Sequence, residues 1–226
     1  MSGLFAHLAP LHLDWGEIGA AGLDTLVMLA GSLVATVIVG LPLGVILFLT
    51  GRGRLLAQPA AHAVLSMVVN GLRSVPFIIL LILMIPLTVL LVGTSLGVAG
   101  AIPPLVVGAA PFFARLVESA LREVDPGVVE AAQAMGATNR QIVFEALLPE
   151  AMPGIAAAVT VTAVALVSYT AMAGVVGAGG LGDLAIRFGY QRFQTDVMIV
   201  TVALLLIIVQ ALQMLGDRVV AYVSHR

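Results

Sequence analysis

Two residue types are missing from the 226-residue sequence, which contains neither cysteine nor lysine. The lack of cysteine excludes disulfides, thiolate metal sites and cysteine nucleophiles. The lack of lysine excludes a nucleotide-binding Walker A loop, because that loop places a lysine on the phosphates. The chain therefore cannot contain an ATPase site of this kind.

Charge is also scarce. Charged residues make up 10% of the sequence and hydrophobic residues 61%, whereas a soluble domain carries about 25% charged residues. The net charge of −2, with no basic tract, argues against a nucleic-acid-binding protein. Since a spanning helix needs about 20 mostly apolar residues, the uncharged windows predict a polytopic protein of the lipid bilayer. These windows are Thr25–Gly51, Leu55–Leu72, Ser74–Ala114, Ala151–Gly182 and Val197–Gly216.

We predict an all-α membrane protein in which residues 1–226 form a single transmembrane domain of about five spans. The second span is interrupted by Arg73 and bent by Pro76 and Pro86. A six-span alternative divides Leu55–Leu91 into two helices, but it would split the positive charge between the two sides of the membrane, so we prefer five. The spans are expected at about 23–49, 60–91, 96–121, 151–173 and 197–220.

The distribution of arginine predicts the orientation. Cytoplasmic loops carry the excess of positive charge, so the N-terminus is expected outside and the C-terminus in the cytoplasm. The segment 125–149 is then cytoplasmic, and 174–196 forms an extracytoplasmic loop. Five spans place Arg187 and Arg192 on the outer side, and on the inner side Arg52, Arg54, Arg115, Arg122, Arg140, Arg218 and Arg226.

Other classes of membrane protein find little support. Ion-coupled secondary carriers often contain inverted repeats and acidic residues at mid-membrane, but the sequence has no such repeat and no acidic residue deep inside a predicted span. No selectivity filter or H-E-x-x-H motif indicates a channel or an intramembrane enzyme. No metal site is predicted either, because no two of the four histidines have the spacing of metal ligands. These are His7, His12, His62 and His225.

The cytoplasmic segment has the local signals of two short helices. Asp125 before Pro126 fits an N-cap followed by proline at the first helical position, and Gly136 suits the left-handed turn that ends a helix. Thr138, with glutamine three residues later, predicts a capping box that opens a second helix, which we expect to end at Pro149. The segment carries no nucleophile–base pair, and its small residues would allow the close approach of a partner. It is predicted to be a docking element.

Within this segment, Glu130-Ala131-Ala132, Gly136 and Leu148-Pro149 have the spacing found in permease subunits of ATP-binding-cassette (ABC) importers, which the chain resembles. The resemblance extends over most of the chain from Leu23 onward. Four further runs are similar to the methionine-import permease group: Arg73-Ser-Val-Pro-Phe-Ile-Ile-Leu-Leu81, Gly108-Ala-Ala-Pro-Phe-Phe-Ala-Arg115, Ala134-Met-Gly-Ala-Thr138, and Gly177-Ala-Gly-Gly-Leu-Gly182 followed by Arg187-Phe-Gly-Tyr190.

The resemblance implies a transport subunit rather than an enzyme. It implies a homodimer of permeases in a bacterial inner membrane, two cytoplasmic ATPase subunits that hold ATP and magnesium, and an extracytoplasmic substrate-binding lipoprotein. The chain itself would bind no cofactor and would translocate L- or D-methionine by alternating access; another amino acid or small polar solute is the alternative. The residues expected to couple it to the ATPase are Glu130, Ala131, Ala132, Met135, Gly136, Ala137, Thr138 and Arg140.

The predicted fourth span ends in a run of small residues around Met172. A flexible thioether can close a narrow path and repack as the path opens. Met172, paired with the same residue of a second copy, is therefore a candidate outward gate, with ordinary helix packing as the alternative. Ser168 and Tyr169 are candidates for the path. The Gly-x-Gly-x-x-Gly run at 177–182 matches a dinucleotide-binding pattern, but a membrane helix precedes it, so we expect a flexible, close-packed outer lip.

Arg73 and Glu118 are charged residues close to the predicted spans. Arg73 is either a cation that snorkels to the inner surface or a cavity residue, and we favour snorkelling. Glu118 lies three residues after Arg115 and four before Arg122. These spacings place the three side chains on one helix face, where we expect them to pair.

Overall fold

The computed structural model of the protein describes residues 14–224, and every regular element within them is helical. The prediction of an all-α fold is confirmed. His7, His12, His225 and Arg226 lie outside the described residues. In chain order the elements are α1 (Trp15–Thr50), α2 (Pro59–Ser74), α3 (Phe77–Leu83), α4 (Ile85–Val92), α5 (Gly97–Arg122), α6 (Pro126–Ala134), α7 (Asn139–Gln141), the π-helical segment η1 (Ile142–Leu147), α8 (Leu148–Gly174), α9 (Gly180–Leu184), the π-helical segment η2 (Ala185–Tyr190) and α10 (Thr195–Ser224).

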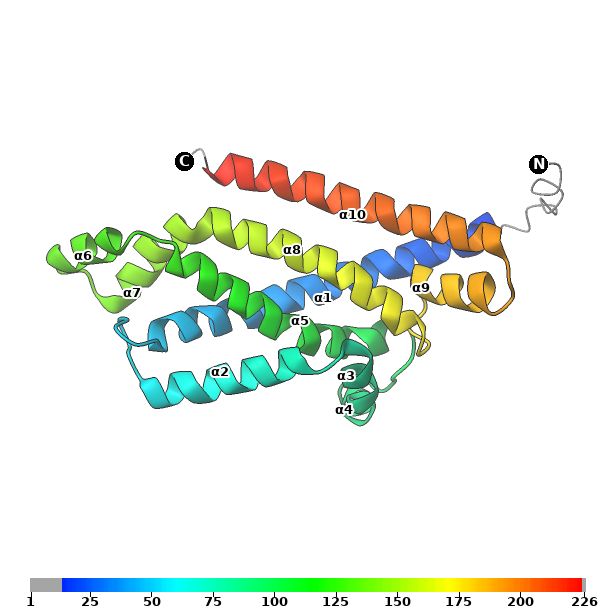
Figure 1. The fold of residues 1–226 in the computed structure, drawn as a ribbon, viewed down its shortest axis with the longest axis horizontal. Coiled ribbons are helices and arrows are strands. Elements are labelled where there is room, and N and C mark those ends of the chain that lie inside the picture. The colour runs from blue at the N-terminus through cyan, green and yellow to red at the C-terminus, as the bar shows by residue number, and fades with distance from the viewer. Residues whose placement is uncertain (1–13, 225–226) are drawn as a thin grey trace.

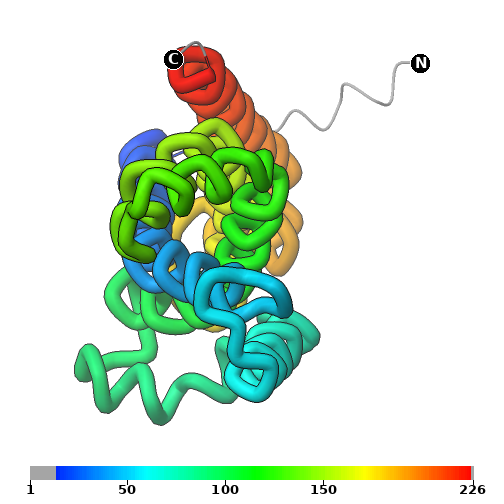
Figure 2. The backbone as a smooth tube through the Cα atoms, turned by 90° about the vertical axis from the view of Figure 1, so that its left-hand side faces the viewer, coloured from blue at the N-terminus to red at the C-terminus, as the bar shows by residue number. Residues whose placement is uncertain are grey.

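Three long helices form the centre of the molecule. α1 packs against both α5 and α8, and α5 also packs against α8. α10 contacts α8 on one side of this group, and α2 contacts α5 on the other side (Figure 1, Figure 2). The short helices α3 and α4 fold beside α5. The central helices thus hold the elements that carry the candidate sites.

α1 and α5 approach each other closely because small residues face one another. Gly40 and Gly44, about one turn apart on α1, lie against Ala110 and Ala114 on α5. A Cβ atom added to Gly44 would lie 2.6 Å from the Ala114 carbonyl oxygen and 2.7 Å from the Val117 Cβ, which is too close for either contact. Small residues at this spacing let membrane helices pack backbone to backbone. The contact fixes α5 and therefore the segment that follows it.

Four helices are long and apolar enough to span a membrane. They are α1, α5, α10 and the continuous helix Asn139–Gly174, which joins α7, η1 and α8. These helices lie at the positions of four predicted spans, 23–49, 96–121, 151–173 and 197–220.

The predicted second span, 60–91, is bent, as its prolines predict, and consists of separate helices. α2, α3 and α4 replace it, and α3 turns by 102° from the direction of α2. Proline explains the break, because Pro76 has no N–H for a helix and its ring disfavours helical backbone in the residue before it. Val75 is accordingly extended, with ψ of 126°. α2 and α3 together are apolar enough for one broken span, so the described residues contain four or five candidate spans.

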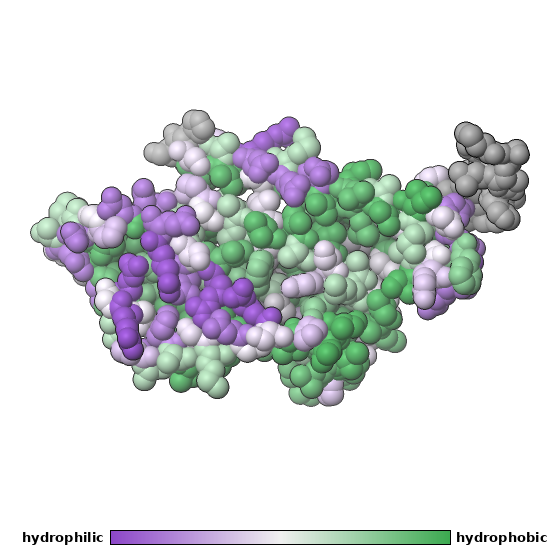
Figure 3. Space-filling model, viewed as in Figure 1, coloured by the Kyte–Doolittle hydropathy of each residue, from purple (hydrophilic) through white to green (hydrophobic). Residues whose placement is uncertain are grey.

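Polar segments gather at the two ends of the long axis. One end holds the turn at 51–58, α6, α7 and the last turns of α10, whereas α9, η2 and the start of α1 lie at the other (Figure 1). On the face shown in Figure 3, hydrophilic residues cover much of the half that holds α6 and α7, hydrophobic residues predominate in the other half, and a smaller hydrophilic group lies at its far end. The turn at 51–58 and η2 thus lie at opposite ends, which is the arrangement that five spans predict (Figure 1). The assignment of these ends to the cytoplasm and the exterior stays a prediction.

Candidate functional site

The docking segment, as we name residues 125–141, begins with the local structure that its sequence predicts. The Asp125 side chain accepts a 2.8 Å hydrogen bond from the Gly127 N–H and caps α6, which opens with a proline. After α6, Gly136 takes a left-handed backbone with φ of 80°. No atom lies within 4 Å of the place that a Cβ on Gly136 would occupy. The bend after α6 is therefore accessible from outside.

Thr138 forms the predicted capping box with Gln141. The Thr138 N–H donates to the Gln141 Oε1 at 2.9 Å, and the Gln141 N–H donates to the Thr138 Oγ1 at 3.4 Å. From the sequence we expect the helix that starts here to end at Pro149. In the structure it continues past this residue, through η1 into α8. In η1 the Leu148 N–H bonds to the Val143 carbonyl five residues back. This wider turn lets the helix pass the proline, which has no N–H to donate.

Six of the eight residues that the sequence analysis expects to couple the chain to an ATPase are exposed. Met135 stands out, with 81% of its surface exposed at the end of α6. Ala132, by contrast, is buried, and Ala137 is half-buried against the same core. The small side chain of Ala132 therefore lets α6 pack on the body of the protein, and it does not offer the close approach to a partner that the sequence suggests. The exposed six are Glu130, Ala131, Met135, Gly136, Thr138 and Arg140.

The sequence does not predict the cavity that lies beside α6. Glu130 and Arg54 both line a cavity of about 390 Å³ between α6 and the turn that follows α1. The Arg54 guanidinium lies 4.4 Å from the centroid of the Phe48 ring, and this cation–π contact holds the turn against α1. In the sequence, the Gly-Arg-Gly-Arg run at 51–54 indicates a charged turn but not its position beside α6.

Glu118 ties the end of α5 to its neighbours. Its side chain is buried and pairs with Arg115 at 2.6 Å and with Arg122 at 2.5 Å, so the pairing predicted from the spacing is confirmed. Arg115 also donates a 3.3 Å hydrogen bond to the backbone carbonyl of Ser66 on α2. The charged cluster therefore joins α2 to α5 just before the docking segment starts.

The candidate path residues on α8 face two different spaces. Ser168 and Met172, one turn apart, line an apolar groove of about 440 Å³ between α8 and α10. Tyr169 lies on another face of α8, where its ring stacks on Phe77 of α3 with 4.5 Å between the ring centroids. Adjacent residues on a helix point about 100° apart, so the structure does not bring the three predicted path residues together.

The glycine run at 177–182 follows α8 and forms a close-packed contact with α1 and α8. The Leu181 N–H donates a buried 2.9 Å hydrogen bond to the Thr25 hydroxyl on α1. A Cβ on Gly182 would collide with the carbonyl oxygen of Ala171, so α8 and the start of α9 touch through their backbones. The expected close packing of the lip is confirmed.

The sequence matches the model of a known family over most of its length. The family model of the binding-protein-dependent transport system inner membrane component covers residues 40–226. The chain belongs to this family. It is therefore a membrane component of a transport system, and the predictions of an importer permease and a multi-pass membrane protein are confirmed.

Several relatives of this permease carry names that mention methionine. A probable D-methionine transport system permease protein of Vibrio cholerae is 52% identical over 203 residues, which cover 90% of each chain. A methionine import system permease protein of Bacillus subtilis is 50% identical over 181 residues, 80% of this permease and 82% of the relative. A solved structure of the MetNI methionine ABC transporter, in an inward-facing conformation, matches with a TM-score of 0.91 at 47% identity, over 92% of this permease and 96% of that chain.

Proposed function

We propose that this permease is the membrane-spanning subunit of an ATP-driven methionine importer in the bacterial inner membrane. Two copies form a homodimer, with the docking segment in the cytoplasm and α9 outside. Two ATPase subunits hold ATP and magnesium, and an extracytoplasmic lipoprotein delivers the substrate. The observation that carries the proposal is that the chain is about half identical to methionine permeases. The docking segment agrees with it, because Met135 and Gly136 are exposed and accessible to a partner.

In this mechanism the docking segment transmits the movement of the ATPase. ATP binding draws the two ATPase subunits together, and the docking segments of both permeases move with them. The permease helices then tilt from an inward-open to an outward-open arrangement, and hydrolysis returns them. The change is driven by the different affinities of the ATPase pair for the two permease states. The six exposed residues of the segment form the contact, while Ala132 and Ala137 anchor it to the permease body.

The test is uptake of labelled methionine into proteoliposomes that contain the permease and its ATPase and receive the binding protein. We expect uptake that needs ATP on the ATPase side and stops when the ATPase is omitted. Hydrolysis stimulated by the loaded binding protein without methionine uptake would instead assign the importer to another amino acid or small polar solute. Methionine movement driven by an ion gradient alone would contradict the proposal.

Met172 is proposed to close the outward path against its copy in the second permease. Its side chain is 45% exposed at the groove between α8 and α10, and so is accessible to a second copy. We expect Met172→Ala to raise the basal leak of methionine and to loosen the coupling of ATP turnover to uptake. Met152→Ala provides the matched control, because Met152 is on the same helix and 48% exposed. Equal leak in the two variants would contradict the gate.

A further inference from the structure

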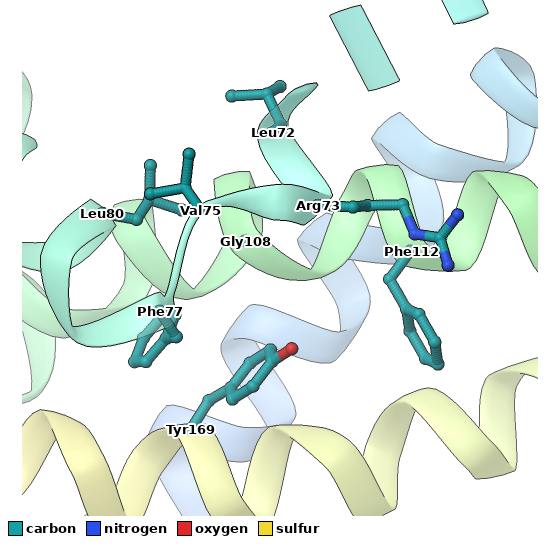
Figure 4. A pocket seen from close by; sticks show the side chains of 8 residues that line it. All are labelled: Leu72, Arg73, Val75, Phe77, Leu80, Gly108, Phe112 and Tyr169. Atoms are coloured by element: carbon teal, nitrogen blue, oxygen red, sulfur yellow. The ribbon is translucent and has the colours of Figure 1, made fainter. Parts of the chain in front are cut away.

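A cavity lies where α2 ends, between α2, α3, α5 and α8 (Figure 4). It measures about 150 Å³. Arg73 extends along one side of it above Phe112, and Phe77 and Tyr169 form the side opposite (Figure 4). The side chains of Arg73, Phe112 and Tyr169 thus surround one space, although they come from three separate helices.

Arg73 is exposed and lies far along α2 from the polar turn at 51–58. It follows the start of α2 at Pro59 by 14 residues, which is about 21 Å at the helical rise. The hydrocarbon core of a bilayer is about 30 Å thick, and α2 ends near the middle of the long axis (Figure 1). From there the side chain extends toward Phe112, where the guanidinium lines the cavity (Figure 4). Its position supports the alternative that the sequence left open, a cavity residue.

The Arg73 charge has no carboxylate partner within residues 14–224, where the ion pairs involve Arg115, Arg122 and Arg187. Its described interaction is with the Phe112 ring, whose centroid lies 5.9 Å from the guanidinium carbon. An ionised side chain at membrane depth faces a water-filled cavity or a partner, because hydrocarbon does not solvate charge. The cavity thus offers an unpaired cation to an anion that enters it.

The wall opposite Arg73 is aromatic. The Phe77 and Tyr169 rings are stacked, with an interplanar angle of 7° and 4.5 Å between centroids. Phe77 is buried, and Tyr169 directs its hydroxyl toward the space below Arg73 (Figure 4). Aromatic rings attract thioether sulfur at their edges and ammonium groups at their faces. The cavity therefore combines one anion-binding group with surfaces suited to an apolar, sulfur-containing side chain.

We propose that this cavity holds the amino acid during its passage, with the Arg73 guanidinium on the α-carboxylate and the Phe77–Tyr169 stack against the thioether side chain. The proposal rests on the proposed function and names a substrate-binding site for it. Arginine suits this role because its planar fork can bind both oxygens of a carboxylate, which the point charge of lysine cannot do.

The test uses the complete transporter of permease and ATPase, without binding protein or nucleotide. Binding of labelled L-methionine is competed with unlabelled methionine and with methioninol, in which an alcohol replaces the carboxylate. In the wild type we expect methionine to bind at least about tenfold more tightly than methioninol, because only methionine can form a charge-assisted hydrogen bond through its carboxylate. Arg73→Gln should abolish this preference and lower uptake by about tenfold or more, while ATP hydrolysis stimulated by the binding protein persists. Arg73→Lys should lie between the two.

Two further variants sharpen the result. Arg218→Gln removes an exposed arginine from α10 and should leave the preference unchanged. Tyr169→Ala removes half of the aromatic stack. It should therefore lower the affinity for methionine more than the affinity for alanine, when both are used as unlabelled competitors. A carboxylate preference that survives in Arg73→Gln would overturn the proposal. So would loss of the homodimer in both Arg73 variants, which would assign this arginine to the contact between copies.

The result also separates this site from the transport function. Absence of ATP-driven methionine uptake by the wild type would contradict the proposed function, yet the competition assay would still show whether Arg73 selects a carboxylate. Normal uptake by the wild type, together with unchanged uptake and carboxylate preference in Arg73→Gln, would remove the site and keep the importer.

Discussion

Gly136→Trp is expected to lower ATP-driven uptake at least about 30-fold, the effect of losing an interface contact of about 2 kcal/mol or more. Gly136 lies at the exposed bend of the docking segment, and in the proposed complex a large side chain there would stand between the permease and the ATPase. The variant should insert in the membrane normally but fail to retain the ATPase subunit. Co-purification of the two subunits and uptake into proteoliposomes measure the two effects.

Gly93→Trp is the matched control for backbone strain. Gly93 ends α4 with φ of 79°, against 80° for Gly136, and a Cβ on either glycine meets no atom within 4 Å. Both variants therefore place tryptophan in the same unfavourable backbone conformation, but Gly93 lies outside the docking segment. Retention of the ATPase by Gly93→Trp and its loss from Gly136→Trp would separate docking from strain. Normal uptake by Gly136→Trp would refute the docking assignment.

Glu118→Ala should be the most damaging substitution for stability. It removes the one carboxylate between Arg115 and Arg122 and leaves the Arg115 charge, whose side chain is 19% exposed, without its partner. Breaking a buried pair in this way costs about 3–5 kcal/mol. The melting temperature of the purified permease in detergent should fall accordingly, and the contact of Arg115 with α2 should loosen as well.

Two variants test whether the unpaired charge causes the loss. Glu123→Ala removes an exposed carboxylate at the end of the same helix and should have little effect. The double variant Arg115→Leu/Glu118→Leu replaces the buried pair by apolar groups, a change that is often neutral. It should recover most of the stability lost in Glu118→Ala. A double variant as unstable as Glu118→Ala would show that packing, rather than charge, accounts for the loss.

The local structure of the docking segment could be predicted because its signals act over a few residues. Asp125 caps the helix that begins at the next residue, Gly136 provides the left-handed bend, and Thr138 bonds to a residue three positions later. Each of these interactions depends on backbone geometry close by in the chain. The buried pairs of Glu118 follow from helical spacing for the same reason.

Features that depend on neighbouring helices could not be predicted in this way. Long apolar helices have little periodicity that distinguishes the lipid-facing side from the buried side. The inward position of Ala132 depends on the packing of α6 against η1, and the cavity around Arg73 depends on the direction that α3 takes after the break. Pro76 indicates a bend, but its angle of 102° is fixed by contacts with α5 and α8.

In the proposed mechanism, the continuous helix from Asn139 to Gly174 acts as a lever arm. Its 36 residues extend about 54 Å at the usual rise of about 1.5 Å per residue. A tilt of about 10° around one end would move the other end by roughly 9 Å. A small rotation at the docking segment is thereby magnified at Tyr169 and Met172, and Pro149 does not act as a joint because η1 carries the helix past it.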